Sequence, residues 1–265
     1  MAIYTGVADA NGDFNIPFSA NYTSGQKVTV TAEKDAATKS IELYAPSDVI
    51  GGGNIQFSGN MTNFPNNIGV ITLTGITTVA QNSFYTDRVV NVFFRKATGL
   101  ILDEGTTSVG IEAFLGWDGA LSLSMPNSLS SIGSGCFRDW INATSITWSS
   151  SLTQIPEFAF YNWRKLVNLI IPTGVTVIGA QAFNNCISLQ SIEILGQVTT
   201  IGAGAFANLT ACNIITLHAT TPPTIQSNTF VSLKSTCIFK VPAESVAAYQ
   251  AAPNWSAFAS RIQAI

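Results

Sequence analysis

The chain has 265 residues, of which 46% are hydrophobic and only 10% are charged, and its formal net charge is −3. The few Lys and Arg residues are scattered, so there is no basic stripe for a phosphate backbone, and we expect no binding to nucleic acid. No apolar run approaches the roughly 20 residues that cross a bilayer, so we expect no membrane span.

Residues 1–50 are expected to form a small β module. The Asn11-Gly12 dipeptide is a turn signal, and residues 24–32 and 39–44 alternate apolar and polar side chains as strands do. The run from Gly25 to Ala32 resembles a strand of a bacterial immunoglobulin-like module. A complete sandwich needs about 100 residues. The resemblance therefore implies a fragment that leans on the rest of the chain, caps it, or completes itself against another subunit.

The residues around this module give two further expectations. Asp9, Asn11 and Asp13 are similar to the start of a calcium loop, but Ala20 stands where its last acidic ligand is needed, so we expect no metal. Residues 51–66 are expected to be a linker, beginning with three glycines, followed by an irregular first coil that shields the N-terminal end of the next segment.

Residues 67–238 carry a repeat with a period of 23 residues, marked by phenylalanine. The interval lengthens to 30 at the first step and to 24 at the last, and the positions are Phe84, Phe114, Phe137, Phe160, Phe183, Phe206 and Phe230. A unit of this length cannot bury its own apolar face, so successive units must stack and equivalent side chains must form columns.

Other positions recur in step with the phenylalanine. A branched aliphatic residue precedes it by five positions, as in Ile155 and Ile178, and glycine often follows that residue, as in Gly179. An alternating apolar pair such as Leu169 and Ile171 indicates a short strand with one buried face. The chain is thus predicted to be mainly β: a solenoid of about seven 23-residue repeats with a parallel sheet, plus the small N-terminal β module.

The unit that runs from Leu169 to Cys186, LIIPTGVTVIGAQAFNNC, closely resembles the BspA-like (Treponema-type) leucine-rich repeat. The resemblance covers roughly residues 66–265, and residues 239–265, with Tyr249 and Trp255, are similar to the usual C-terminal cap of that family. The first two units depart from the pattern, because Asp87 and Trp117 stand where Cys or Leu is usual, and we expect distortion there.

The residues give little support to catalysis. His218 is the single histidine, and the nucleophile-elbow pattern Gly-x-Ser-x-Gly does not occur. None of the four cysteines forms a Cys-x-x-Cys pair, so zinc ligation is not expected. Each cysteine is expected in a small buried slot, with a disulfide between Cys186 and Cys212 as the alternative. We expect neither an enzyme nor a cofactor.

Two sets of residues are candidates for binding. Residue parity places one set on the outward face of the sheet, where it forms either a recognition surface or an ordinary solvated face: Asp103, Thr147, Ile170, Glu193 and His218. The other set is a column of tryptophans that each follow an anchor phenylalanine by three, and it is either internal packing or an exposed aromatic platform: Trp117, Trp140 and Trp163.

These features predict a non-enzymatic attachment module for a protein or a surface glycan. The first residues lack the basic start and apolar core of a secretory signal. We therefore expect a phage or prophage virion protein, such as a tail or capsid-decorating component on the virion surface, that contacts a bacterial surface. Residues 1–50 are expected to contact other virion subunits or to form a homo-oligomer through exposed edges. The alternative is an extracellular BspA-like adhesin on a bacterial cell surface.

Overall fold

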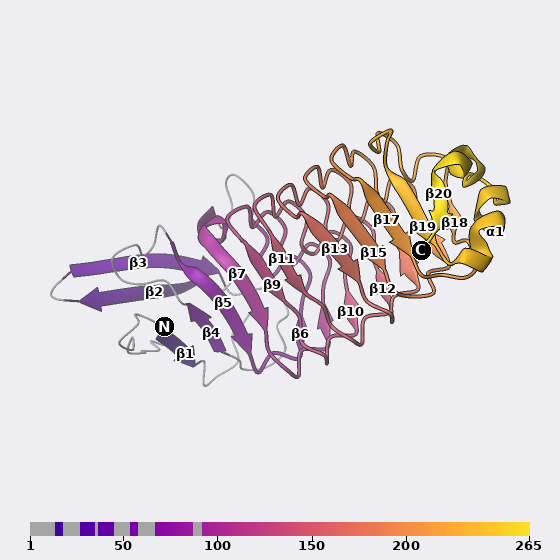
Figure 1. Cartoon of the computed structure of the whole chain (residues 1–265). Helices are drawn as coiled ribbons and strands as arrows, with labels where there is room; N and C mark the ends of the chain where they lie inside the picture. Colours follow the sequence, from indigo (N-terminus) through magenta and orange to yellow (C-terminus); the bar gives the residue numbers. More distant parts are fainter. Residues whose placement is uncertain (1–13, 18–26, 35–36, 45–53, 58–66, 87–91) are drawn as a thin grey trace.

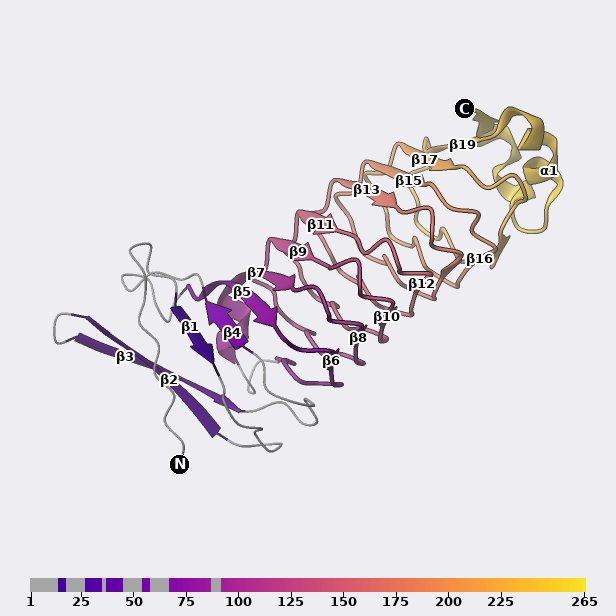
Figure 2. The same cartoon turned by 90° about the horizontal axis from the view of Figure 1, so that it is seen from below.

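The computed structural model describes residues 14–17, 27–34, 37–44, 54–57, 67–86 and 92–265. The chain winds into a solenoid whose coils follow one another from the N-terminal strands at one end to the C-terminal helices at the other (Figure 1). Figure 2 shows the same stack from below, with the coils one behind another. The predicted solenoid of about seven turns is confirmed.

One side of every coil contributes a strand to a long parallel face. The first hydrogen-bonded group contains four such strands: β5 (Gly69–Thr74), β7 (Ala97–Leu102), β9 (Ser122–Ser124) and β11 (Ser145–Thr147). The second group has five: β13 (Asn168–Ile171), β15 (Ser191–Ile194), β17 (Ile214–Leu217), β19 (Ile238–Val241) and β20 (Ile262–Ala264). Pairing is in register, so that Ile192 lies opposite Leu169 and Ile215.

A second side carries two-residue strands, one per coil, each holding the aliphatic anchor predicted from the sequence. They are β6 (Thr78–Val79), β8 (Ser108–Val109), β10 (Ser131–Ile132), β12 (Gln154–Ile155), β14 (Val177–Ile178), β16 (Thr200–Ile201) and β18 (Thr224–Ile225). The third side is a turn that carries the phenylalanine, and its backbone also bonds to the next coil: the Phe137 N–H donates to the Ala159 carbonyl at 3.1 Å.

The phenylalanines form a continuous internal column. Neighbouring rings stack with centroid separations between 5.2 Å, for Phe84 and Phe114, and 5.9 Å, for Phe206 and Phe230. Every ring of the column is buried. Their shared interior is the core of the protein, because no single coil encloses it.

Glycine after the aliphatic anchor lets adjacent coils approach closely. A Cβ on Gly133 would lie 2.4 Å from the Ile111 nitrogen, and one on Gly110 would lie 2.3 Å from the Gln81 nitrogen. The equivalent residue of the first coil is Ala80, next to β6, which is the terminal strand of its sheet in the described part of the chain. The methyl group of Ala80 therefore has no preceding short strand to overlap in the described part of the chain.

Both strand ladders are interrupted at the coil that contains Phe160. In the described part of the chain, β10 and β12 belong to different hydrogen-bonded sheets, as do β11 and β13. Pro156 replaces the glycine whose N–H bonds to the preceding coil elsewhere, as Gly133 N–H does to Val109, and proline has no such donor. On the other side, the larger Trp148 occupies an aliphatic position and packs edge-on against Phe160 at 5.2 Å.

The N-terminal strands differ from the expected arrangement. Strand β4 (Asn54–Phe57) pairs antiparallel with β5, and β1 (Phe14–Pro17) pairs antiparallel with β4. Residues 54–57 therefore extend the sheet as a strand instead of forming an irregular coil. Strands β2 (Lys27–Lys34) and β3 (Ala37–Tyr44) form a separate antiparallel hairpin, as their alternation predicted. The Asn11-Gly12 turn, the Asp9 to Asp13 segment, the three glycines and Asp87 lie outside the described residues.

The C-terminal segment closes the other end. The short helices are η1 (Val92–Lys96) within an early coil and then η2 (Ala243–Ser245), α1 (Val246–Ala251) and η3 (Ser256–Arg261) at the C-terminal end. Tyr249 and Trp255 are buried and donate hydrogen bonds to the last coil, to the carbonyls of Ala219 and Pro223 at 2.9 and 2.8 Å. Within the described residues, no helix is long and apolar enough to cross a membrane.

Replacing Gly133 by Ala tests the close approach of the coils. The added methyl group overlaps the backbone of Gly110 and Ile111, so we expect a loss of about 1–3 kcal/mol in the free energy of unfolding, measured by urea denaturation. The control is Ser131→Ala on the adjoining strand β10, at an exposed position, with an expected change within about 0.5 kcal/mol. Equal stability of the two variants would contradict the proposed packing.

Candidate functional site

The outward face of the long sheet is the candidate binding surface. Across the second group of strands, Ile170, Glu193, Thr216 and Lys240 are in-register partners, and Gln263 follows Lys240 on the last strand. The alternate residues of these strands, such as Ile171 and Ile194, are buried in the core. Because period-two alternation directs every second side chain outward, the row faces away from the core, with Ile170 and Gln263 exposed and the other three half-buried.

Three of the candidate residues lie together. The Nε2 atom of His218 is 2.9 Å from Oε1 of Glu193, and both side chains remain about two-fifths exposed, at 37% and 43%. Ile170, on the strand beside Glu193, is 54% exposed. The cluster therefore offers a hydrogen-bonding pair next to an uncovered aliphatic group.

Asp103 and Thr147 lie apart from this cluster. Asp103 follows β7 and is exposed, with its Oδ1 accepting a hydrogen bond from the Glu104 N–H at 2.9 Å. Thr147 is exposed at the end of β11, on the other side of the interruption between β11 and β13. The face is therefore two polar stretches, with Asp103 and Thr147 on the first and Ile170, Glu193 and His218 on the second.

Lys240 belongs to the same face, although the sequence pattern assigned it to the cap. Strand β19 pairs in register with β17, and the Lys240 Nζ donates to the Ala264 carbonyl at 2.7 Å. The alternation of apolar Phe239 and Val241 around Lys240 in the sequence is typical of a strand with one buried face, and it could have indicated that Lys240 points outward.

The tryptophan column is internal. Trp117, Trp140 and Trp163 have no exposed surface, and their rings stack at 5.7 and 5.5 Å. Each indole N–H donates to the carbonyl of an anchor phenylalanine, as Trp140 does to Phe114 at 2.7 Å. The interpretation as a platform for sugars is therefore wrong, because these rings present no face to solvent.

All four cysteines occupy buried slots, as expected. Burial raises the pKa of the Cys186 thiol to about 12, and its Sγ donates to the Phe160 carbonyl at 3.4 Å. Cys212 lies beside Cys237, with 3.8 Å between their Sγ atoms. The alternative pairing of Cys186 with Cys212 is therefore not favoured by the arrangement of the coils.

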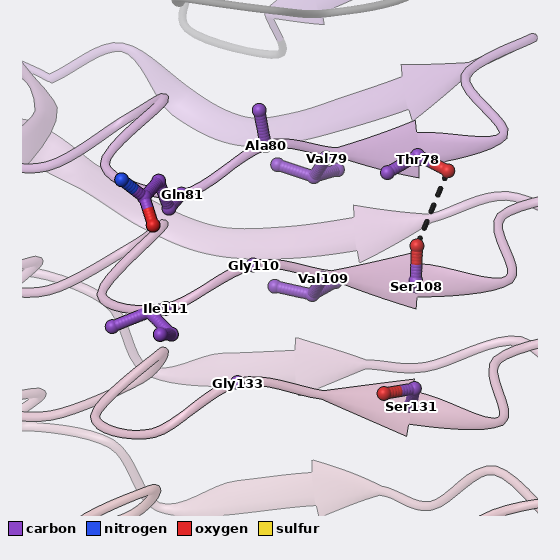
Figure 3. A pocket seen from close by; sticks show the side chains of 10 residues that line it. All are labelled: Thr78, Val79, Ala80, Gln81, Ser108, Val109, Gly110, Ile111, Ser131 and Gly133. Carbon is purple, nitrogen blue, oxygen red and sulfur yellow. Dashed lines mark hydrogen bonds between the residues drawn. The ribbon is translucent and has the colours of Figure 1, made fainter.

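A shallow depression of about 420 Å³ lies over β6, β8 and β10 (Figure 3). Gly110 and Gly133 form part of its floor, and the Ser108 hydroxyl donates to the Thr78 hydroxyl at 3.2 Å within it. Its lining residues carry no charge, so they supply hydroxyl and amide contacts but no acid or base. The depression follows from the close coil approach that glycine permits.

The titratable groups of the sheet face include one hydrogen-bonded pair, His218 with Glu193. The hydrogen-bond partner of His218 is a carboxylate on the sheet surface, and no hydroxyl or thiol nucleophile joins this pair among the described residues. In the same part of the chain, no group of three or more His, Cys, Asp and Glu side chains is placed to hold a metal ion.

The comparison with protein families identifies the repeat. Residues 107–237, just under half of the chain, match the model of the BspA type leucine-rich repeat region in six copies. The repeat type expected from the sequence is confirmed for this segment, and its proteins are typically non-enzymatic binding modules. The immunoglobulin-like resemblance of the N-terminal residues stays a prediction. No curated protein matches the chain.

Several bacterial leucine-rich repeat structures are similar in fold. A leucine-rich repeat protein of T. pallidum is 21% identical, with a TM-score of 0.49, over 55% of this chain and 73% of that chain. A leucine-rich cell surface protein of Faecalibacterium prausnitzii is 13% identical, with a TM-score of 0.36, over 80% of this chain and 92% of that chain. The pneumococcal vaccine antigen PcpA is 12% identical, with a TM-score of 0.34, over 100% of this chain and 98% of that chain.

Replacing Trp140 by Ala tests the internal role of the column. The variant loses two stacked neighbours and leaves the Phe114 carbonyl without its indole donor, so we expect a loss of roughly 3–5 kcal/mol in the free energy of unfolding. Urea denaturation followed by far-UV circular dichroism measures it. Ile170→Ala, at an exposed position, is the control, with an expected change within about 0.5 kcal/mol. A fully stable Trp140→Ala protein would contradict the packing role.

Proposed function

We propose that this chain is an adhesin-like, non-enzymatic attachment module that binds a protein through the outward face of its long sheet. The observation that carries the proposal is the in-register row of outward side chains on strands that the buried core holds rigid. The repeat family supports it, because leucine-rich repeat proteins typically bind proteins.

The construction of the face favours recognition without rearrangement. Its residues lie on, or directly beside, the paired strands β13, β15, β17 and β19, so binding does not require a loop to become ordered, which is a common cost of association. Ile170 offers an apolar contact, and the Glu193–His218 pair and Lys240 offer hydrogen bonds and charge of both signs around it. Such a mixed surface suits a protein partner with a complementary polar patch.

The side chains on the row favour a protein over a glycan. Sugar rings are commonly held by stacking on exposed aromatic faces, and the tryptophans that would supply such faces are buried. The row itself contains aliphatic, hydroxyl and charged groups, as in Ile170, Thr216 and Lys240. A surface glycan is therefore the second choice of ligand.

The location that we propose is a bacterial cell surface or the extracellular space. The BspA type of the repeat supports this reading over the virion reading, which rested on the character of the first residues and on the N-terminal resemblance. Contact of residues 1–50 with virion subunits therefore has no support from the family of the repeats.

Self-association through the N-terminal strands remains a separate proposal. Strand β1 is the terminal strand of its sheet in the described part of the chain, and a terminal strand presents backbone groups that a second strand can pair with. The hairpin of β2 and β3 adds a second antiparallel element at the same end (Figure 1). A homo-oligomer would multiply weak contacts of the sheet face into stronger attachment.

Charge placed on the sheet face tests the proposed function. The full chain is applied to an array of extracellular matrix proteins and, at the same density, to an array of glycans. We expect binding on the protein array, and we expect Ile170→Glu to weaken it at least tenfold, since an unpaired buried charge costs more than about 1.4 kcal/mol.

The matched control is Ile111→Glu, which makes the same change at a position that is 50% exposed, next to the opposite strand β8. It is expected to bind like the unaltered chain, and both variants should keep its circular dichroism spectrum. Binding to glycans alone, or equal loss in the two variants, would overturn the assignment of the ligand class or of the face.

A further inference from the structure

Two successive members of one internal column are cysteines. From the coil of Phe114 onward, the residue six or seven positions after the anchor phenylalanine is buried in the core, and its N–H donates to the carbonyl three residues earlier. The column contains Ala120, Ala143, Leu166, Leu189, Cys212 and Cys237, and all of them are buried. The extra residue of the last repeat falls before Cys237, so the two cysteines remain equivalent by this hydrogen bond.

The stacking places the two thiols in contact. The Sγ atoms of Cys212 and Cys237 are 3.8 Å apart, and nearby Ile214 and Ile238 are parallel strand partners. Neighbouring strands lie about 4.8 Å apart, which falls within the range of about 4.4–6.8 Å between the Cα atoms of a disulfide. A covalent bond therefore needs side-chain rotation and only a small adjustment of the backbone.

We propose that Cys212 and Cys237 are an oxidative cross-linking site, and that a small-molecule disulfide or a thiol oxidase joins them into one disulfide between the last two coils. The proposal rests on the geometry of the coils and does not depend on which ligand the sheet face binds. It concerns the region where β17 and β19 adjoin the C-terminal helices (Figure 1).

The reaction is an ordinary thiol–disulfide exchange. The Cys212 thiolate attacks one sulfur of oxidised glutathione, which forms a mixed disulfide and releases one glutathione thiolate. Cys237 then gives up its proton to the solvent, and its sulfur attacks Sγ of Cys212 and releases the second glutathione. Two protein thiols are oxidised, and one glutathione disulfide is reduced to two thiols. Because both sites are buried, the exchange takes place in the folding or locally opened chain.

The local interactions assign different roles to the two sulfurs. The Cys237 thiol donates its hydrogen bond to Sγ of Cys212, which lowers the pKa of Cys212, and the positive charge of Lys234 acts in the same direction. That hydrogen bond, together with burial, raises the pKa of Cys237. When the two are in contact, Cys212 is therefore the sulfur that reacts first.

The other two cysteines have no equivalent partner. Cys136 belongs to the column that holds Ala113 and Ala159 in the adjacent coils, and Cys186 lies between Trp163 and Leu209 in its own column. The period of the repeat therefore predicts a single pairing. The cross-link would join the last coil to the one before it. The C-terminal Arg261 also binds this last coil, since its guanidinium donates to the carbonyls of Lys234, Ser235 and Cys237.

Peptide mapping of the full chain tests the pairing. The reduced protein is unfolded in urea and refolded in a mixture of reduced and oxidised glutathione, and remaining thiols are counted under denaturing conditions. We expect the count to fall from the four of the sequence to about two. Cleavage by trypsin and then after Glu193 separates Cys186 from Cys212, so the predicted product is peptide 194–234 joined to peptide 235–240.

Stability supplies a second readout. Closing the loop between residues 212 and 237 should raise the melting temperature of the oxidised protein by roughly 5–10 °C over the reduced protein. Cys237→Ser should lose both the joined peptide and this rise. Cys136→Ala should keep both, because other coils have alanine at that position.

Three results would overturn the proposal: four free thiols in the refolded chain, a joined peptide that contains Cys136 or Cys186 instead, or the same rise in Cys237→Ser. If that variant does not fold, the peptide map of the unaltered chain decides. If the unaltered chain does not regain its native spectrum, the same map is made after native protein is incubated with oxidised glutathione, and four free thiols there would equally reject the cross-link.

Discussion

The structure depends on the spacing of in-register parallel strands. When each coil lies one strand spacing from the next, every side chain meets its own counterpart, so the choice of residue at one position is constrained by the same position in the neighbouring coils. Phenylalanine stacks on phenylalanine at 5.2–5.9 Å. Glycine at 133 is required because the backbone of the preceding coil lies where its Cβ would be.

This constraint divides the residues between structure and recognition. Inward columns are occupied by groups that satisfy each other, including buried indoles whose N–H groups donate to the phenylalanine carbonyl of the preceding coil. Only the side chains of the outward row do not pack in the core, so a different residue there changes the binding surface and leaves the core unchanged. Ile170 beside the Glu193–His218 pair is an example of such variation on an otherwise hydroxyl-rich face.

The same constraint explains where the strand ladders are interrupted and where two reactive side chains come into contact. Pro156 removes one donor where the ladder of short strands is interrupted, and on the long sheet the break beside Trp148 separates the stretch with Thr147 from the stretch with Ile170. Near the C-terminal end, Cys212 and Cys237 are successive members of one column, and the stacking alone places their Sγ atoms 3.8 Å apart. In both cases a residue acts through the neighbour that the stacking assigns to it.

The sequence by itself determined the solenoid, its period, the columns and the outward parity of Asp103, Thr147, Ile170, Glu193 and His218, because the period of the repeat and the alternation of strands are both one-dimensional patterns. It left open whether Trp117, Trp140 and Trp163 face water, since a spacing of three after the phenylalanine fixes a column but not its side. Only the tertiary structure decided that these indoles are buried, that residues 54–57 form an antiparallel strand, and that Lys240 joins the sheet face. These outcomes depend on how one coil meets the next at a given position. That contact is a property of the assembled stack and not of any single repeat.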